Sequence, residues 1–202
     1  EGHSLPPDQF VPIAEHSGLM IPLGEWVART AMRWRAGLRG RVDEDFRVAI
    51  NVSRIQFAEP DFAQKFLAIL DASGLQGPQV EIELTESVAI DNLDKLTAKL
   101  QALRGRGIRV AMDDFGTGYS SLSVIQRLQL DHLKIDRSFV SGDKVGEGSF
   151  EIARTVIAMA DHLRLSTIAE GVETQAQCDA LLAAGCQEGQ GYLFSRPLGE
   201  AD

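Results

Sequence analysis

Cysteine is scarce in this chain: Cys178 and Cys186 are the only two among 202 residues. Domains that depend on disulfides carry several cysteines at regular spacings, so a disulfide framework is not expected here. The composition favours a reduced, cytoplasmic protein in which both cysteines pack in the core.

Long apolar runs and basic surfaces are also missing. No stretch approaches the roughly 20 apolar residues of a membrane-spanning helix, and no signal peptide is visible. Lys and Arg number 20 against 29 Asp and Glu, so the net charge is −9 and no basic stripe offsets it. This balance argues against binding DNA or RNA non-specifically, and an anionic substrate would need metal ions to reverse the charge locally. The four histidines lack ligand-like spacing and are predicted to be surface or helix-cap residues.

Short runs rich in branched residues alternate with helix-like segments. Strands are predicted at 48–52, 80–84, 109–112, 132–135, 166–169 and 191–194. Helices are predicted at 7–16, 23–38, 61–73, 92–104, 120–128, 150–163 and 174–184, and the glycine-rich loop 141–149 is expected to be flexible. Strict alternation of this kind implies an α/β fold with a parallel sheet and right-handed crossovers.

Two α/β architectures compete. An open doubly wound sheet usually has a glycine-rich turn after its first strand, and Asn51-Val-Ser-Arg-Ile-Gln56 has none. Polar residues at several strand ends are typical of a (β/α)8 barrel of the TIM type, which needs eight strands. We therefore predict one domain over residues 1–202, an incomplete barrel with about six of its eight strands. The chain begins with Glu1 rather than methionine, so we expect a piece of a longer protein.

Polar residues recur where the predicted strands end. They are Asn51, Glu83, Asp113 with Asp114, Lys134 with Asp136, and Glu170. Anionic oxygens gathered at one end of parallel strands repel each other and are costly to desolvate. They persist where a divalent cation neutralises them, so the pattern indicates a metal-dependent active site.

Strand parity supports this interpretation, because successive side chains point to opposite faces. Asp113 shares a face with Ala111 and Arg109, whereas Val110 and Met112 face the helices. The polar residue nearest each strand end falls opposite the branched apolar residues in the same way. Glu81 and Arg109 lie deeper, and a simple ion pair between them inside the barrel is an open alternative.

Six segments carry a family resemblance. They are Asn51-Val-Ser-x-x-Gln56, Glu83-Leu-Thr-Glu-Ser87, Asp113-Asp-Phe-Gly-Thr-Gly-Tyr-Ser-Ser-Leu122, Lys134-Ile-Asp-Arg-Ser-Phe139, Ala169-Glu-Gly-Val-Glu-Thr174 and Gly185-Cys-x-x-Gly-Gln-Gly-Tyr-x-Phe-x-x-Pro-Leu198. In order and spacing the chain resembles the EAL domain, a bacterial phosphodiesterase that opens cyclic di-GMP to linear pGpG. Asp-Phe-Gly alone also occurs in protein kinases, but no kinase glycine-rich loop or His-Arg-Asp motif accompanies it.

One part of the family pattern is missing. The Glu-Ala-Leu strand, whose glutamate binds metal, and a nearby phosphate-binding arginine do not occur in this sequence. The resemblance implies that roughly 45 residues precede Glu1, which agrees with the shortfall from a barrel of about 250 residues. We therefore expect this stretch alone to be nearly inactive.

The resemblance implies a site for two Mg²⁺ or Mn²⁺ ions. Asn51, Glu83 and Asp113 would bind the first ion, and Asp113 would bridge to a second ion that Asp114 also holds. Glu170 would be a ligand of the second ion or the proton acceptor.

The remaining roles also follow from the family. Lys134 would orient the attacking water or stabilise the transition state, with Asp136 as its support. A mutual ion pair inside the barrel is the alternative for these two residues. Gln190 would arrange the metal-bound water or the guanine-phosphate end of the substrate.

Two further glutamates have weaker assignments. Glu86 would anchor the loop from Phe115 to Leu122, which can gate metal binding and carry regulation. Glu173 has either a secondary role in the site or that of a charge ahead of helix 174–184, where the helix dipole favours it.

The implied partners are cyclic di-GMP as substrate, a second copy in a homodimer, and upstream sensory or GGDEF-type domains in the parent protein, which could be tethered to a membrane. A non-catalytic receptor for the same dinucleotide is the alternative function. The intact set of strand-end residues favours the enzyme, because degenerate members of the family usually lose metal carboxylates or the loop motif.

Overall fold

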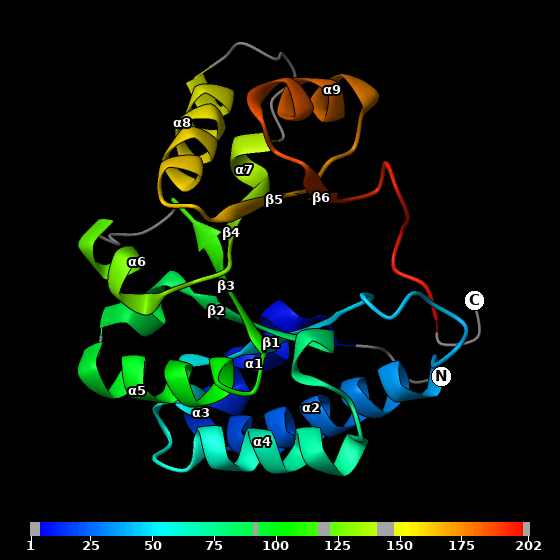
Figure 1. The fold of residues 1–202 in the computed structure, drawn as a ribbon, viewed down its shortest axis with the longest axis vertical. Helices are drawn as coiled ribbons and strands as arrows, with labels where there is room; N and C mark the ends of the chain where they lie inside the picture. The colour runs from blue at the N-terminus through cyan, green and yellow to red at the C-terminus, as the bar shows by residue number, and fades with distance from the viewer. Residues whose placement is uncertain (1–4, 91–92, 117–121, 141–147, 200–202) are drawn as a thin grey trace. The chain divides into compact units, whose positions relative to one another are not determined.

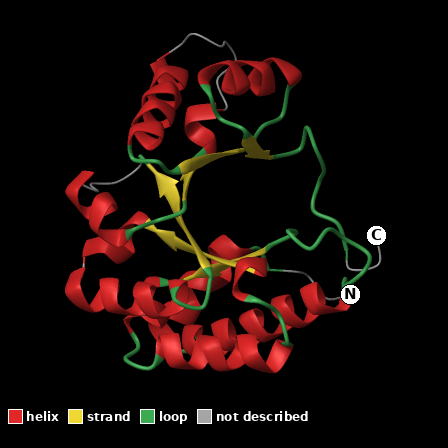
Figure 2. Cartoon of the chain, viewed as in Figure 1, coloured by secondary structure: helices red, strands yellow, loops and turns green. Residues whose placement is uncertain are grey.

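The computed structural model describes residues 5–90, 93–116, 122–140 and 148–199. Its helices are α1 (Pro7–Ser17), α2 (Met20–Gly37), α3 (Arg54–Ala58), α4 (Phe62–Ser73), α5 (Leu93–Arg104), α6 (Leu122–Leu128), α7 (Arg137–Val140), α8 (Gly148–His162) and α9 (Gln175–Ala184), with short 3-10 helices η1 (Gly77–Gln79) and η2 (Glu86–Ile90). Its strands are β1 (Val48–Val52), β2 (Val80–Thr85), β3 (Arg109–Phe115), β4 (His132–Ile135), β5 (Ser166–Glu170) and β6 (Glu188–Gln190). Figures 1 and 2 show these elements.

The strands follow one another along the sheet in sequence order, from β1 to β6. β1 pairs with β2, β3 with β4, β4 with β5, and β5 with β6, each pair in parallel. A parallel sheet in sequence order with helical crossovers is the arrangement of a (β/α)8 barrel. The predicted fold class is thus confirmed, with six strands among the described residues.

The chain divides into two compact units, Glu1–Leu84 with Ile90–Val110 (unit 1) and Thr85–Ala89 with Ala111–Asp202 (unit 2). That the 202 residues form a single domain stays a prediction. Both cysteines are free: Cys186 is buried and Cys178 is half-buried. No helix in the described ranges is long and apolar enough to cross a membrane.

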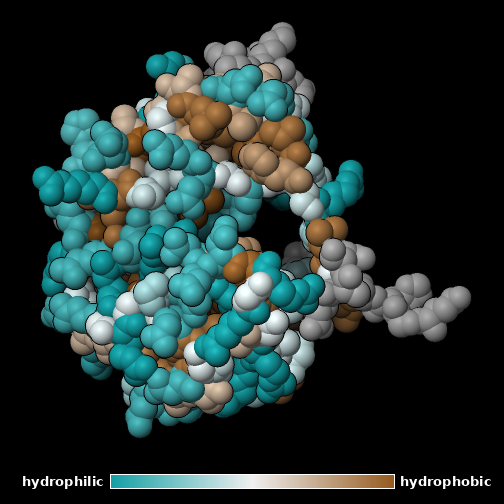
Figure 3. Space-filling view, turned by 45° about the vertical axis from the view of Figure 1, so that its right-hand side comes forward, coloured by the Kyte–Doolittle hydropathy of each residue, from teal (hydrophilic) through white to brown (hydrophobic). Residues whose placement is uncertain are grey.

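In unit 1, α2 packs against β1 and α4 (Figure 2). It begins at Met20, three residues before the predicted start, and buries the face of Gly24, Ala28, Met32 and Arg35. Trp26 and Trp34 lie outside this face, with exposed fractions of 62% and 38%. Figure 3 shows hydrophobic residues gathered in separate patches on a mainly hydrophilic face.

The predicted helix ends in unit 1 agree with the structure where glycine marks them. Gly18 and Gly74 adopt left-handed conformations, with φ of 74° and 70°, and cap α1 and α4. The short helix α3 was missed. Ser53 caps it in a capping box, in which Ser53 Oγ accepts from Gln56 N and Gln56 Oε1 accepts from Ser53 N.

Glu81 lies on β2 in unit 1. Its carboxylate is buried and lies 4.0 Å from Arg47 Nε, just before β1. The predicted pairing of Glu81 with Arg109 stays a prediction.

In unit 2, α7, α8 and α9 lie on one side of β5 and β6 (Figure 1). The last strand is Glu188–Gln190, so the predicted strand 191–194 is wrong. Val172 causes the difference. Its N–H donates to Gln190 O at 3.1 Å and its carbonyl accepts from Leu193 N at 3.0 Å, which turns the chain directly after Gln190. Gly191 allows this close approach, because a Cβ there would overlap the Val172 backbone.

Some predictions fall outside the described residues. The loop 141–149 lies there almost entirely, and so do the central residues 117–121 of the loop between Phe115 and Leu122. Residue 92 and residues 120–121, the predicted starts of two helices, lie there as well.

Candidate metal centre and active site

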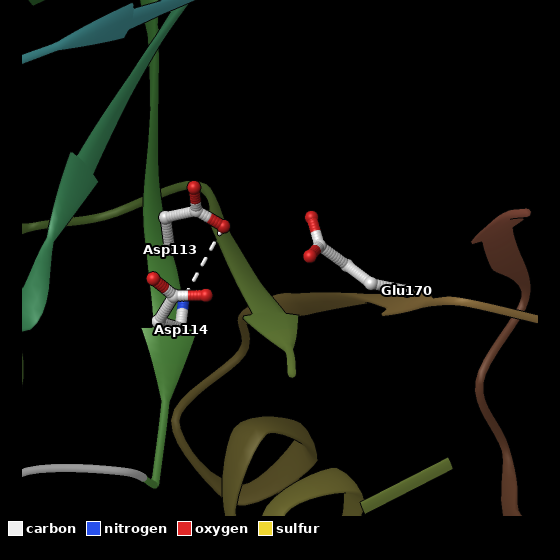
Figure 4. A group of neighbouring side chains, drawn as sticks. All are labelled: Asp113, Asp114 and Glu170. Atoms are coloured by element: carbon white, nitrogen blue, oxygen red, sulfur yellow. Dashed lines mark hydrogen bonds between the residues drawn. The ribbon is translucent and has the colours of Figure 1, made fainter. Parts of the chain in front are cut away.

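Three carboxylates of unit 2 meet at strand ends. Asp113 and Asp114 are carried by β3 and Glu170 by β5, and one oxygen from each lies within 4.8 Å of the others. Figure 4 shows the two aspartates side by side, with the Glu170 carboxylate reaching toward them. The structure therefore brings together three of the residues that the sequence predicts as metal ligands.

An irregularity in β3 places both aspartates in this cluster. The register with β4 shifts between Met112 and Phe115, and Asp114 has a φ of 54°. Aspartate is among the few non-glycine residues that tolerate this left-handed region. In a regular strand neighbouring side chains point to opposite faces, so the bulge lets consecutive carboxylates act at one site.

Lys134 joins the cluster from β4. Its Nζ lies 3.1 Å from Asp113 Oδ1 and 2.6 Å from Glu170 Oε1, and its side chain is only 4% exposed. A buried ammonium group next to two carboxylates offsets much of their repulsion. Lys134 thus connects the ends of three strands, whereas its pairing with Asp136 stays a prediction.

Gln190 supports Glu170 from the next strand. The two residues are register partners on β5 and β6, and Gln190 Nε2 donates to Glu170 Oε1 at 2.8 Å. The same carboxylate oxygen therefore receives Lys134 and Gln190. This arrangement fixes the direction of the Glu170 side chain.

Asp136 affects Asp114. Burial, the charge of Asp113 and the charge of Asp136 raise the pKa of Asp114, and Lys134 only partly opposes them. Burial also acts to raise the pKa of Asp136, but hydrogen bonds from Ser138 and the Arg137 backbone outweigh it and lower that pKa. One of these bonds runs from Ser138 N to Asp136 Oδ1 at 3.0 Å. Asp136 is therefore the more readily ionised of the two groups.

Asn51 and Glu83 form a second polar pair, in unit 1. They are register partners near the ends of β1 and β2, and Glu83 is buried whereas Asn51 is exposed. Their spacing on neighbouring strands suits two ligands of one ion. Their joint ligation with Asp113 stays a prediction.

The two second-tier glutamates differ in surroundings. Glu86 is buried at the start of η2, and the centre of the loop that it is predicted to anchor lies outside the described residues. Glu173 is exposed, and its N–H donates to Gln177 Oε1 at 2.8 Å just before Thr174, the N-cap of α9. This is the position of a charge that the helix dipole favours.

The histidine prediction is wrong for one residue. His16 and His162 are exposed in the last turns of α1 and α8, as expected, and His3 lies outside the described residues. His132 is buried on β4, two residues before Lys134, and its Nε2 lies 3.9 Å from Glu188 Oε1. Its parity with Lys134 was the available signal for an inward side chain.

Comparisons with known proteins identify the family of this chain. The family model described as EAL domain matches residues 1–197. The cyclic di-GMP phosphodiesterase NbdA of Pseudomonas aeruginosa is 41% identical over 194 residues, which cover 96% of this chain and 25% of NbdA. The bifunctional diguanylate cyclase/cyclic di-GMP phosphodiesterase MucR of the same species is 38% identical over 95% of this chain and 28% of MucR.

Solved structures agree in fold. The PaMucR phosphodiesterase in complex with c-di-GMP superposes with a TM-score of 0.91 at 36% identity, covering 96% of this chain and 78% of that one. The EAL domain of Mycobacterium smegmatis DcpA has a TM-score of 0.83 at 40% identity, covering 89% and 81%. This chain thus spans about a quarter of the curated relatives NbdA and MucR.

Proposed function

Because this chain belongs to the EAL domain family, we propose that it is the catalytic part of a phosphodiesterase that hydrolyses cyclic di-GMP to linear pGpG. The observation that carries the proposal is the cluster of Asp113, Asp114 and Glu170 around the buried Lys134. Relatives named as cyclic di-GMP phosphodiesterases support the choice of substrate. The non-catalytic receptor becomes an outcome of the test.

The donor set suits Mg²⁺ or Mn²⁺. Its side chains offer only oxygens, and three carboxylate oxygens already lie within 4.8 Å of one another. We propose that Asn51, Glu83 and Asp113 hold one ion and that Asp113 and Asp114 hold a second, with Glu170 beside them as the proton acceptor. Two ions in such a site would lower the pKa of a bound water and offset the charge of the phosphodiester.

The side chains around the cluster would control the attacking water. Its oxygen bonds to phosphorus, one of its protons passes to Glu170, and the bond from phosphorus to the 3′ oxygen breaks. The 3′ oxygen then takes up a proton, so one water is consumed and the phosphate stays on the 5′ side of linear pGpG. Lys134 stabilises the negative charge that develops on the phosphoryl oxygens. Gln190 keeps the Glu170 carboxylate aimed at the water.

Hydrolysis by the full-length protein tests the proposal. Conversion of cyclic di-GMP to pGpG in Mn²⁺, followed by chromatography, is expected for the wild type and is abolished in Asp113→Asn with the fold retained. Asp161→Asn, an exposed aspartate on α8, is the matched control and keeps wild-type turnover. Unchanged turnover in Asp113→Asn would contradict the proposal, and binding without turnover in the wild type would identify a receptor.

A further inference from the structure

The Gln56 side chain lies against a glycine of another helix. Gln56 belongs to α3 and is only 6% exposed, and Gly24 lies in the buried face of α2. A methyl group at Gly24 would overlap the carbon, nitrogen and oxygen atoms of the Gln56 carboxamide. The Gln56 carboxamide therefore occupies the space that a side chain at position 24 would fill.

The same carboxamide closes the turn that follows β1. Gln56 Oε1 accepts a hydrogen bond from Ser53 N at 3.2 Å, and Gln56 N donates to Ser53 Oγ at 3.2 Å. Ser53 has the extended conformation of an N-cap, with φ −68° and ψ 154°. Asn51 lies two residues before Ser53, and the intervening Val52 is buried. The buried Val52 and the Ser53 cap together fix the path of the chain after Asn51.

Glycine inside a helix is unfavourable, so position 24 calls for an explanation. Gly24 does not have the left-handed backbone conformation that favours glycine. The lack of room for a side chain is therefore the reason for glycine at this position. Gly37, at the end of the same helix, shows the contrast, because a methyl group there would meet no atom within 4 Å. Of these two glycines of α2, only Gly24 lacks room for a methyl group.

We propose that Gln56 is a positioning residue for the Asn51 carboxamide and that Gly24 is required because it leaves room for Gln56. The proposal rests on the proposed function, in which Asn51 binds a metal ion. The Gln56 carboxamide packs against α2 at Gly24 and accepts a hydrogen bond from the Ser53 N–H. The turn held in this way fixes the direction of the chain after Asn51. Residues that hydrogen-bond a metal ligand typically contribute about ten- to hundredfold to metal affinity, and we expect the same range for Gln56.

A double-mutant cycle in the full-length protein tests the contact between the two residues. The Mn²⁺ dissociation constant is measured by titration calorimetry for wild type, Gly24→Ala, Gln56→Ala and the double variant, and Tm is measured in EDTA. Each single change is expected to raise the dissociation constant about ten- to hundredfold. The double variant is expected to match Gln56→Ala, because the methyl group then fills vacated space. Gly37→Ala is the matched control and leaves affinity unchanged.

Three results would overturn the contact. One is additive effects in the double variant, and another is a loss in Gly37→Ala as large as that in Gly24→Ala. If Gly24→Ala fails to fold, removal of the Gln56 side chain is expected to restore folding. A double variant that still fails to fold would show that Gly24 makes room for something other than Gln56.

A second cycle separates positioning from general support of the fold. In an Asn51→Ala background, Gly24→Ala and Gln56→Ala are expected to cause no further loss of Mn²⁺ affinity, because the group that they position is gone. Further loss, or an unchanged affinity in Asn51→Ala itself, would overturn the positioning role. The proposed function fails separately, if the wild type shows Asn51-dependent Mn²⁺ binding without hydrolysis of cyclic di-GMP.

Discussion

Two buried cations, one in each unit, have nearly the same burial and different partners. Arg35 in unit 1 is 1% exposed and Lys134 in unit 2 is 3% exposed. Arg35 donates to the backbone carbonyls of Phe46 at 2.6 Å, Glu44 at 3.2 Å and Asp43 at 3.3 Å. Lys134 contacts the carboxylates of Asp113 and Glu170 instead.

The difference between these partners separates structural from functional polar groups. The backbone carbonyls around Arg35 carry no net charge. Arg35 donates hydrogen bonds to them and thereby fixes the segment that leads into β1. The carboxylates around Lys134 carry more negative charge than one ammonium group can balance. Burial alone therefore does not identify a functional cation, whereas an excess of opposite charge around it does.

The largest expected effect is that of Lys134→Met on catalysis. Loss of the ammonium group removes stabilisation of the transition state, so kcat should fall by about 100- to 1000-fold. The metal-free protein should also lose stability, because two carboxylates lose their buried partner, and Mn²⁺ should restore part of it. Steady-state kinetics and thermal unfolding with and without Mn²⁺ measure both effects. A variant with normal kcat would place Lys134 in the same class as Arg35.

Arg35→Met should have the opposite profile. Removal of the guanidinium leaves buried carbonyls without donors and should lower the free energy of unfolding by about 2–3 kcal/mol. At temperatures where the variant stays folded, kcat should remain within about twofold of the wild-type value. A twofold change in kcat corresponds to less than about 0.5 kcal/mol in the activation free energy. Urea denaturation and kinetics at 20–25 °C would check this, and a large loss of kcat would break the comparison.

Gln190→Met sharpens the comparison within unit 2. The variant loses the hydrogen bond to the Glu170 carboxylate, so kcat should fall by about ten- to hundredfold, in line with about 1.5–3 kcal/mol for a bond to a charged group. Gln187→Met, an exposed glutamine before β6, is the control and should change nothing. Equal losses in both variants would show that the effect comes from β6 rather than from the bond.

The smallest effect concerns the pH dependence of stability. Asp114 has a raised pKa in the folded protein, so the folded state holds its proton more tightly than the unfolded state. The metal-free protein should therefore lose stability as pH rises from the unfolded pKa through the raised folded pKa. Asp114→Asn removes that loss. Thermal unfolding in EDTA from pH 3.5 to 8 compares the two slopes, and identical slopes would contradict the assigned shift.

Parity along the strands was enough to predict much of the site. A side-chain period of two places Asp113, Lys134 and Glu170 inward, and the structure brings these three together. The pairing of Glu170 with Gln190 was not predictable, because the polar strand Glu188–Gln190 has no apolar alternation. The strand was predicted at the apolar run 191–194 instead. Hydrogen bonds with Val172 turn the chain directly after Gln190, so this run is not a strand.

The irregular parts needed the structure. The predicted strand ends at Met112, yet β3 continues to Phe115, which pairs with Ile135, although aspartate is unfavourable in strands. The left-handed conformation of Asp114 lies within this irregular stretch and has no signal of its own in a sequence. The five-residue helix α3 is too short to show a helical period, and the burial of His132 depends on strand pairing and on Glu188, far away in the chain.

The two hydrogen bonds of Val172 also determine where the chain can change length. Its N–H and carbonyl bind the backbone on either side of Gly191, so segments 170–172 and 190–193 are held in a fixed register. An inserted residue in either segment would shift Glu170 relative to Gln190. Insertions into the exposed turns at the ends of α9 leave this match unchanged. Length variation among relatives should therefore concentrate around α9, and these two short segments should be free of gaps.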